Sequence, residues 1–114
     1  MKVSEIPYER ADAEKVCGVI DKAVEKINAA KSVDDVLEAR ELVNDALRDF
    51  YTESSLANAR FTLNTKDEFY SAEKDYYDEK MPVVQVSYLK YADAILSSKF
   101  LDELKTKINP VIIK

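Results

Sequence analysis

Residues 33–63 read VDDVLEARELVNDALRDFYTESSLANARFTL, and apolar side chains recur through them at steps of three and four. That spacing places the apolar residues on one face of an α-helix, opposite a charged face. The stripe comprises Val36, Ala39, Val43, Ala46 or Leu47, Phe50, Ser54, Ala57 and Phe61. Because Ser54 and Ala57 are small, a neighbouring helix can approach closely there. The stretch predicts one long amphipathic helix that buries this face against other helices.

A shorter amphipathic helix is predicted before it, starting near Ala11 or Asp12 and ending near Lys31. Its apolar stripe is Val16, Ile20, Ala23, Ile27 and Ala30, widened by Val19 and Val24. Residues 1–10 are predicted to be an extended lead-in, because Pro7 disfavours helix in the residue before it.

Two capping signals separate the predicted helices. Ser32 and Asp35 form an acidic variant of the capping box, and Thr65 and Glu68 stand in the full Thr-x-x-Glu relation. A third helix is expected to follow, with Phe69, Ala72, Tyr76 and Tyr77 on its first apolar face.

The stretch after Pro82 is ambiguous, because Val84, Val86 and Tyr88 alternate as in a strand. A helical register holds for longer, and no partner strand is visible. Its members are Met81, Val84, Tyr88, Tyr91 and Ile95. We therefore predict that the third helix kinks at Pro82 and continues to about Leu96.

A short last helix is predicted after the N-cap signal Ser97-Ser98, and Asn109-Pro110 ends it. Its face is Phe100, Leu101, Leu104 and Ile108. Residues 1–114 are thus expected to form a single all-α domain. It is an antiparallel bundle of about four helices, two of them long. The apolar ending Val111-Ile112-Ile113-Lys114 suggests that the natural polypeptide continues.

The composition excludes several kinds of site. The 114 residues contain no histidine, one glycine and one cysteine. No His-bearing zinc site, Ser-His-Asp triad or Cys-His dyad can form on this chain. One glycine cannot supply a glycine-rich phosphate loop. Cys17 is expected to be a packed small residue without an internal disulfide, in a reducing compartment.

The net charge of −5 argues against nucleic-acid or anionic-membrane partners. The sequence has no apolar run of signal-peptide length and no stretch long enough to cross a bilayer. We expect a cytoplasmic protein.

Two clusters could carry chemistry. The first is the carboxylates Glu73, Asp75, Asp78 and Glu79. A Glu-x-x-His di-metal site is impossible without histidine, and the Asp-x-Asp-x-Asp-Gly spacing of a calcium loop does not occur. A glycosidase-type pair stays open. We predict a solvated helix face. The second is Tyr70, Tyr76, Tyr77, Tyr88 and Tyr91, which are typical either of core and rim or of a contact surface. We assign no catalytic, cofactor-binding or metal-binding residue.

An alternative is a stand-alone, non-enzymatic interaction module. Heptad-like spacing in the two long helices could support a homodimer through an unpartnered apolar stripe.

The opening residues 4–10, SEIPYER, resemble the start of oligoendopeptidase F-type enzymes of the thimet oligopeptidase superfamily. Residues 59–70, ARFTLNTKDEFY, with AEKDYYDE at 72–79 and then Pro82, resemble that family's junction between the second and third helices. Residues 98–100, SKF, are similar to the start of its next helix. The resemblance covers essentially the whole chain. Phe61 departs from it, since a polar residue, often histidine, is expected there.

The resemblance implies an N-terminal domain of a much longer, almost entirely helical zinc metallopeptidase. In such enzymes a His-Glu-x-x-His helix and a downstream Glu hold zinc, and none of these residues lies here. The N-terminal helices wall a channel that admits short peptides. The implied partner is the catalytic domain of the same polypeptide, and the chain alone is expected to be inactive and zinc-free.

Overall fold

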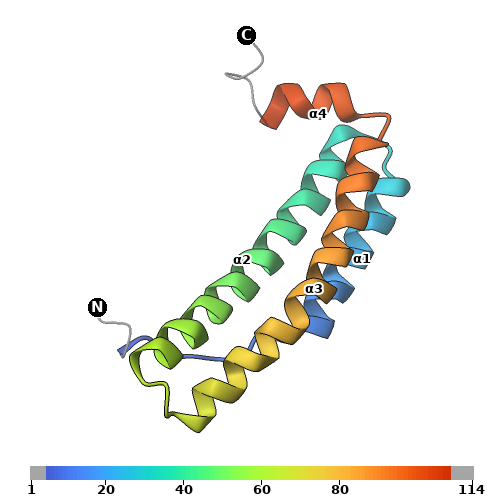
Figure 1. Ribbon diagram of the computed structural model, residues 1–114. Coiled ribbons are helices and arrows are strands. Elements are labelled where there is room, and N and C mark those ends of the chain that lie inside the picture. The colour runs from blue at the N-terminus through green and yellow to red at the C-terminus, as the bar shows by residue number, and fades with distance from the viewer. Residues whose placement is uncertain (1–4, 109–114) are drawn as a thin grey trace.

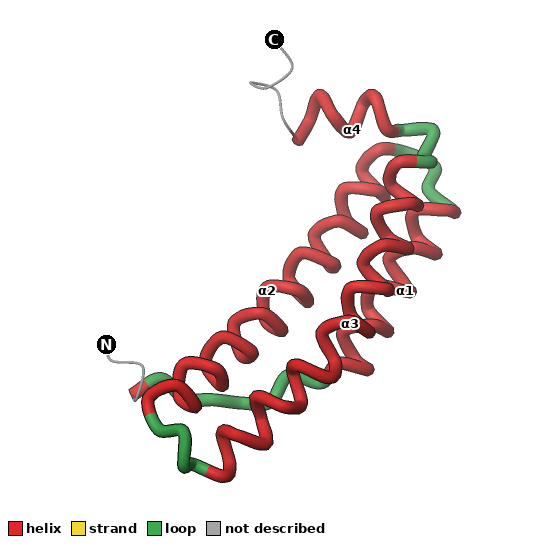
Figure 2. Tube along the Cα trace, in the orientation of Figure 1, coloured by secondary structure: helices red, strands yellow, loops and turns green. Residues whose placement is uncertain are grey.

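The computed structural model describes residues 5–108 and consists of four helices joined by short connections (Figure 1). They are α1 (Ala13–Asn28), α2 (Val33–Leu63), α3 (Glu68–Leu96) and α4 (Leu101–Ile108). Helices α1, α2 and α3 run antiparallel in sequence order, and α4 crosses the end where α2 begins. Residues 5–108 contain no strand (Figure 2). The prediction of an all-α bundle of about four helices, two of them long, is confirmed.

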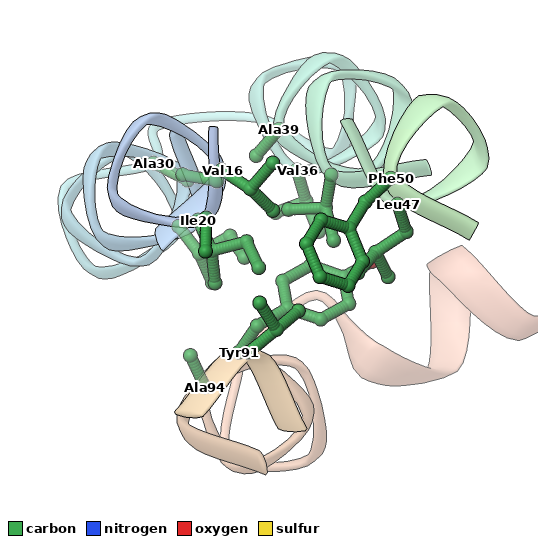
Figure 3. Close-up of a cluster of buried hydrophobic side chains, with 14 of the residues drawn as sticks. Val16, Ile20, Ala30, Val36, Ala39, Leu47, Phe50, Tyr91 and Ala94 are labelled. Carbon is green, nitrogen blue, oxygen red and sulfur yellow. The ribbon is translucent and has the colours of Figure 1, made fainter. Parts of the chain in front are cut away.

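The core lies along the shared axis of the three longer helices (Figure 3). The α1 stripe, from Val16 to Ala30, is buried as predicted. The α2 stripe is buried from Val36 to Ala57, whereas Phe61 at its end is only half-buried. From α4, Leu104 completes the core at 2% exposure. Hydrophobic periodicity therefore predicted the buried faces of α1 and α2.

The predicted first face of α3 is largely wrong. Of its members, only Tyr77 is buried, and Phe69 is 57% exposed. The true buried stripe is Glu73, Tyr77, Val84, Ser87, Tyr91 and Ala94. These residues lie on one face of the helix, so the carboxylate of Glu73 occupies a position where an apolar side chain would be expected. Helix α3 passes through Pro82 as one continuous helix. The kink expected there stays a prediction.

Two of the predicted caps use other groups. The Ser32 side chain makes no capping bond, and Asp35 instead accepts from the amide of Lys31 at 3.0 Å. The N-cap of α3 is Asp67, not Thr65, and it accepts from the amide of Tyr70 at 3.2 Å. An aspartate directly before the first turn reaches those amides more closely than a threonine two residues earlier.

The other helix ends follow the sequence more closely. Asp12 caps α1 by accepting from the amides of Glu14 and Lys15. Helix α1 ends at Asn28, earlier than expected. Before α4, the Ser98 hydroxyl accepts from the amide of Phe100 at 3.1 Å. The stop signal Asn109-Pro110 and the apolar ending lie outside the described residues.

The molecule is elongated, measuring 51 × 29 × 19 Å. Its radius of gyration is 17.1 Å, against about 13 Å for a compact domain of this length. Since α1 has 16 residues and α2 has 31, α1 reaches only about half of the way along the α2–α3 hairpin. Residues 5–12, here called the N-terminal strap, cover the other half (Figure 1). No helix among the described residues is long and apolar enough to cross a membrane.

Candidate functional site

The N-terminal strap packs one aromatic ring against the first part of α3. The ring of Tyr8 makes edge contacts with Phe69, Tyr70 and Tyr77, with centroids 6.2, 5.7 and 6.4 Å away. Tyr77 packs in turn on Phe50 of α2, at 5.3 Å. Aromatic pairs favour such edge-to-face geometry. The strap therefore extends the core beyond the point where α1 begins.

Glu73 is the polar centre of this region and is only 3% exposed. Its Oε1 accepts from the Tyr8 hydroxyl at 2.7 Å and from Arg10 Nε at 2.9 Å. Its Oε2 accepts from Arg10 Nη2. The guanidinium also lies 4.3 Å from the ring centroid of Tyr76. A buried carboxylate is tolerated when it is paired and its lone pairs are satisfied, as both oxygens are here.

Two tyrosines of α3 extend this network to the backbone of the strap. The hydroxyls of Tyr8 and Tyr77 lie 2.8 Å apart, and Tyr77 also accepts from the amide of Ala11 at 2.9 Å. Since Tyr8 gives its single proton to Glu73, Tyr77 supplies the proton between the two hydroxyls. Tyr76 accepts from the amide of Ala13 at 2.9 Å and donates to the Ala11 carbonyl at 2.8 Å. Tyr76 thereby satisfies one of the unpaired amides at the start of α1. We call Tyr8, Arg10, Glu73, Tyr76 and Tyr77 the Glu73 network.

The strap is also tied to α2. Arg60 Nη2 donates to the carbonyl of Ile6 at 2.9 Å, and the guanidinium lies 5.3 Å from the ring centroid of Tyr70. The amide of Glu9 donates to Glu53 at 3.1 Å. Both long helices thus hold the same eight-residue segment.

The Glu73 network keeps Glu73 ionised and its tyrosines protonated, rather than transferring protons. The hydrogen bonds from Arg10 lower the pKa of Glu73, outweighing the effect of its burial. Burial, followed by the hydrogen bond to Glu73, raises the pKa of Tyr8, and burial raises that of Tyr77. A general acid or base needs a pKa near the working pH and a free face toward substrate. These groups meet neither condition, so the network is a structural lock.

The pKa directions predict the dependence of stability on pH. Because the folded-state pKa of Glu73 is lowered, its contribution is present above the ordinary value of 4.5 and is lost as pH falls below it. The pKa of Tyr8 is raised from 10.0, so its contribution is present below pH 10 and is lost as pH rises further. Urea midpoints measured from pH 3 to 11 should fall at both ends. The acid limb should be shallower in Glu73→Gln than in the parent chain, and equal limbs would contradict this assignment.

The predicted solvated carboxylate cluster divides into two parts. Asp75, Asp78 and Glu79 are exposed as expected, and Asp78 pairs with Lys74 at 2.6 Å. The prediction is wrong for Glu73, which is buried. The signal that could have found it is its spacing of four residues before Tyr77, on the buried stripe. No group of three or more described side chains could hold a metal ion.

The tyrosine cluster is core and rim for the most part. Tyr77 and Tyr91 are buried, Tyr70 and Tyr76 are half-buried, and Tyr88 is 40% exposed. Cys17 is half-buried against the core, as expected, with its Sγ 4.0 Å from the carbonyl of Val83.

A groove of about 620 Å³ runs between the strap, the start of α1 and the middle of α2. Its apolar lining includes Val16, Val19, Leu42, Ala46 and Phe50, and its charged lining is Glu9, Arg10, Asp12, Lys15, Asp45, Asp49 and Glu53. The carboxylates outnumber the cations by five to two. The residues that line the groove include no cysteine and no hydroxyl side chain.

Comparison with known proteins gives a consistent answer. The family model for the peptidase M3 N-terminal domain matches residues 3–114. A structure of PZ peptidase A with an inhibitor has a TM-score of 0.88 and 34% identity, covering 93% of this chain and 19% of that one. A 3.1 Å structure assigned to oligoendopeptidase F has a TM-score of 0.88 and 36% identity, covering 94% and 19%.

A third structure, assigned to oligoendopeptidase F from Bacillus anthracis str. Ames, has a TM-score of 0.86 and 33% identity over 91% of this chain. No curated protein sequence matches. The chain spans about a fifth of the length of the solved structures it resembles. The family model covers nearly every residue, and the structural agreement extends along the whole bundle. The chain therefore belongs to the M3 peptidase family, as its N-terminal domain.

Proposed function

We propose that this chain is the scaffold domain of a zinc-dependent oligopeptidase, in which it walls the channel that admits short peptides. The observation that carries the proposal is the match of nearly the whole chain to the N-terminal domain family, at 19% of the length of each solved relative. The activity and the substrates belong in this proposal to the whole polypeptide. The Glu73 network supports a scaffold role because it uses its polar groups to fix shape.

Zinc does not fit this part of the molecule. The chain has no histidine, and no three metal-binding side chains converge among residues 5–108. Glu73, the one buried carboxylate, already uses both oxygens. In this proposal zinc is bound by the catalytic part of the same polypeptide, and residues of this chain take no part in the hydrolytic step.

A chimera tests the proposal. The N-terminal segment of an oligoendopeptidase F is replaced by this chain, and the resulting chimera is here called the host enzyme. We expect the host enzyme to cleave a fluorogenic peptide of about ten residues at a rate within about tenfold of the unmodified oligoendopeptidase F. A tenfold change in rate corresponds to about 1.4 kcal/mol of activation free energy. It should leave unfolded casein intact. A host lacking the segment should either lose peptide cleavage or begin to cleave casein.

The isolated chain is the control. It should show no zinc-dependent peptide cleavage and less than stoichiometric zinc by elemental analysis. If the host lacking the segment kept both its rate and its substrate-length limit, the domain would wall nothing and the proposal would be wrong.

The second candidate is a stand-alone interaction module that forms a homodimer. It is favoured by exposed apolar side chains on α3, among them Val86 at 55% and Leu89 at 66%. Light scattering separates the two, since a dimer would have twice the 13.0 kDa mass of the chain. A cytoplasmic location is part of the first proposal and is supported by the single cysteine, which cannot form an internal disulfide.

A further inference from the structure

The face of α3 that points away from the core changes its chemistry at Pro82. Before Pro82 this face carries the exposed acids Asp75, Asp78 and Glu79. After Pro82 it carries exposed apolar side chains. At 100° per residue, positions 82, 86, 89 and 96 lie within about 80° of one another and opposite the buried Val84. We call Pro82, Val86, Leu89 and Leu96 the α3 stripe.

The α3 stripe is too concentrated to be ordinary surface scatter. Nine large apolar side chains are exposed in the described chain, and three of them lie on this one face of α3. Val86 is 55% exposed, and Leu89 and Leu96 are each 66% exposed. Single exposed apolar residues are normal, whereas a contiguous apolar patch indicates an interaction surface.

No described element covers the stripe. Helices α1 and α2 both pack on the buried side of α3, and α4 packs on α2. In the three solved relatives, the part that resembles this chain is 19% of the polypeptide, so about four fifths of each lies outside it. That remaining length is large enough to supply a covering surface.

The charges around the stripe describe the surface that would fit it. Asp78 is neutralised by Lys74, whereas Asp75 and Glu79 have no ion-pair partner among residues 5–108. Asp93 adds a further exposed carboxylate between Leu89 and Leu96, and Lys90 is the one exposed cation on α3 that borders the stripe among the described residues. A complementary surface is therefore apolar along its length and carries cations opposite these acids.

We propose that the α3 stripe docks against the catalytic part of the same polypeptide, through a surface of that chemistry. The inference rests on the proposed function and adds the specific face by which the scaffold is attached. The stripe runs along the second half of α3, away from the strap and the Glu73 network.

Cysteine labelling tests the docking. Two proteins are compared: the isolated chain, and a host enzyme whose oligoendopeptidase F part has no cysteine of its own. In both, Cys17→Ala removes the native thiol, and a single cysteine is then introduced at one of two positions. Val86→Cys lies on the stripe, and Lys22→Cys lies on the exposed polar face of α1 as the matched control. We expect Val86→Cys to react with a maleimide at least 100-fold more slowly in the host enzyme than in the isolated chain. Lys22→Cys should change by less than about threefold, and both should react fast when the host is unfolded in urea.

The outcomes separate this inference from the proposed function. If Val86→Cys stays reactive in a host enzyme that still cleaves peptides, the docking inference fails and the proposed function stands. If the folded isolated chain cannot complete the host, the proposed function fails and the inference fails with it. If Val86→Cys is protected in the isolated chain and light scattering shows a dimer, a second copy covers the stripe and the inference is overturned.

A second variant checks the energetics without a thiol. Val86→Asp should leave the melting temperature of the isolated chain within about 2 °C, because the side chain is exposed there. In the host enzyme the same substitution should lower the melting temperature clearly, because it places a charge in an apolar contact. Equal small shifts in both proteins would overturn the inference.

Discussion

Arg10→Met should lower the free energy of unfolding by about 2–4 kcal/mol, because it removes the cation that compensates the buried carboxylate of Glu73. Arg10 supplies bonds to both oxygens of Glu73, and Tyr8 alone would remain. The side chain of Arg10 is itself 51% exposed, so solvent screening places the expected loss toward the lower end. Since a domain is typically stable by 5–15 kcal/mol, the change is large. Urea unfolding followed by circular dichroism measures it.

The control for this substitution is Arg48→Met, which removes an exposed ion pair with Asp45 at 3.4 Å. Such pairs contribute about 0–1 kcal/mol. The double variant Arg10→Met, Glu73→Met should recover part of the loss, because it removes the uncompensated charge as well. A loss in Arg10→Met no greater than that in Arg48→Met would show that the network does not lock the strap.

Tyr77→Ala should cost about 3–5 kcal/mol, as large-to-small changes in a core do. The ring is 1% exposed and contacts both Phe50 and Tyr8, and its hydroxyl holds the amide of Ala11. The substitution opens a cavity and releases the strap together. Tyr77→Phe keeps the ring and loses only the hydroxyl, for an expected cost of about 1–2 kcal/mol.

Tyr51→Ala is the matched control for Tyr77→Ala, since Tyr51 also makes an edge contact with Phe50 but is 41% exposed. Its truncation should cost about 1 kcal/mol or less. Unfolding free energies rank the three variants, and amide exchange at Ala11 should accelerate in both Tyr77 variants. Equal losses in Tyr77→Ala and Tyr51→Ala would contradict the role given to Tyr77.

Periodicity predicted the buried faces of α1 and α2 because both helices pack along their whole length against other helices. It failed at the start of α3, where the neighbour is the strap. The strap is extended and presents polar side chains and backbone amides to α3. These groups form hydrogen bonds with Glu73, Tyr76 and Tyr77, whereas Phe69 stays exposed. The spacing from Tyr77 could place Glu73 on the buried face, but the sequence around Glu73 could not show its partners, because Tyr8 and Arg10 lie more than 60 residues away.

The capping errors have a local cause. Ser32, Asp35, Thr65 and Asp67 all offer an oxygen near a helix start, and a spacing rule cannot show which one reaches the free amides. The family resemblance identified the domain, but it implied no catalytic or zinc-binding residue in this chain. The Glu73 network and the α3 stripe depend on which side chains are buried in the folded chain, and the sequence pattern alone does not determine this.

The strap also has a consequence for the order of folding. Tyr8 precedes Glu73 by 65 residues and Tyr77 by 69, whereas the α2–α3 hairpin forms from neighbouring segments. Closing a long loop before its contacts form is entropically unfavourable. Because synthesis starts at the N-terminus, the strap leaves the ribosome before α3 has been made. We therefore expect the strap to pair last, after the α2–α3 hairpin has formed.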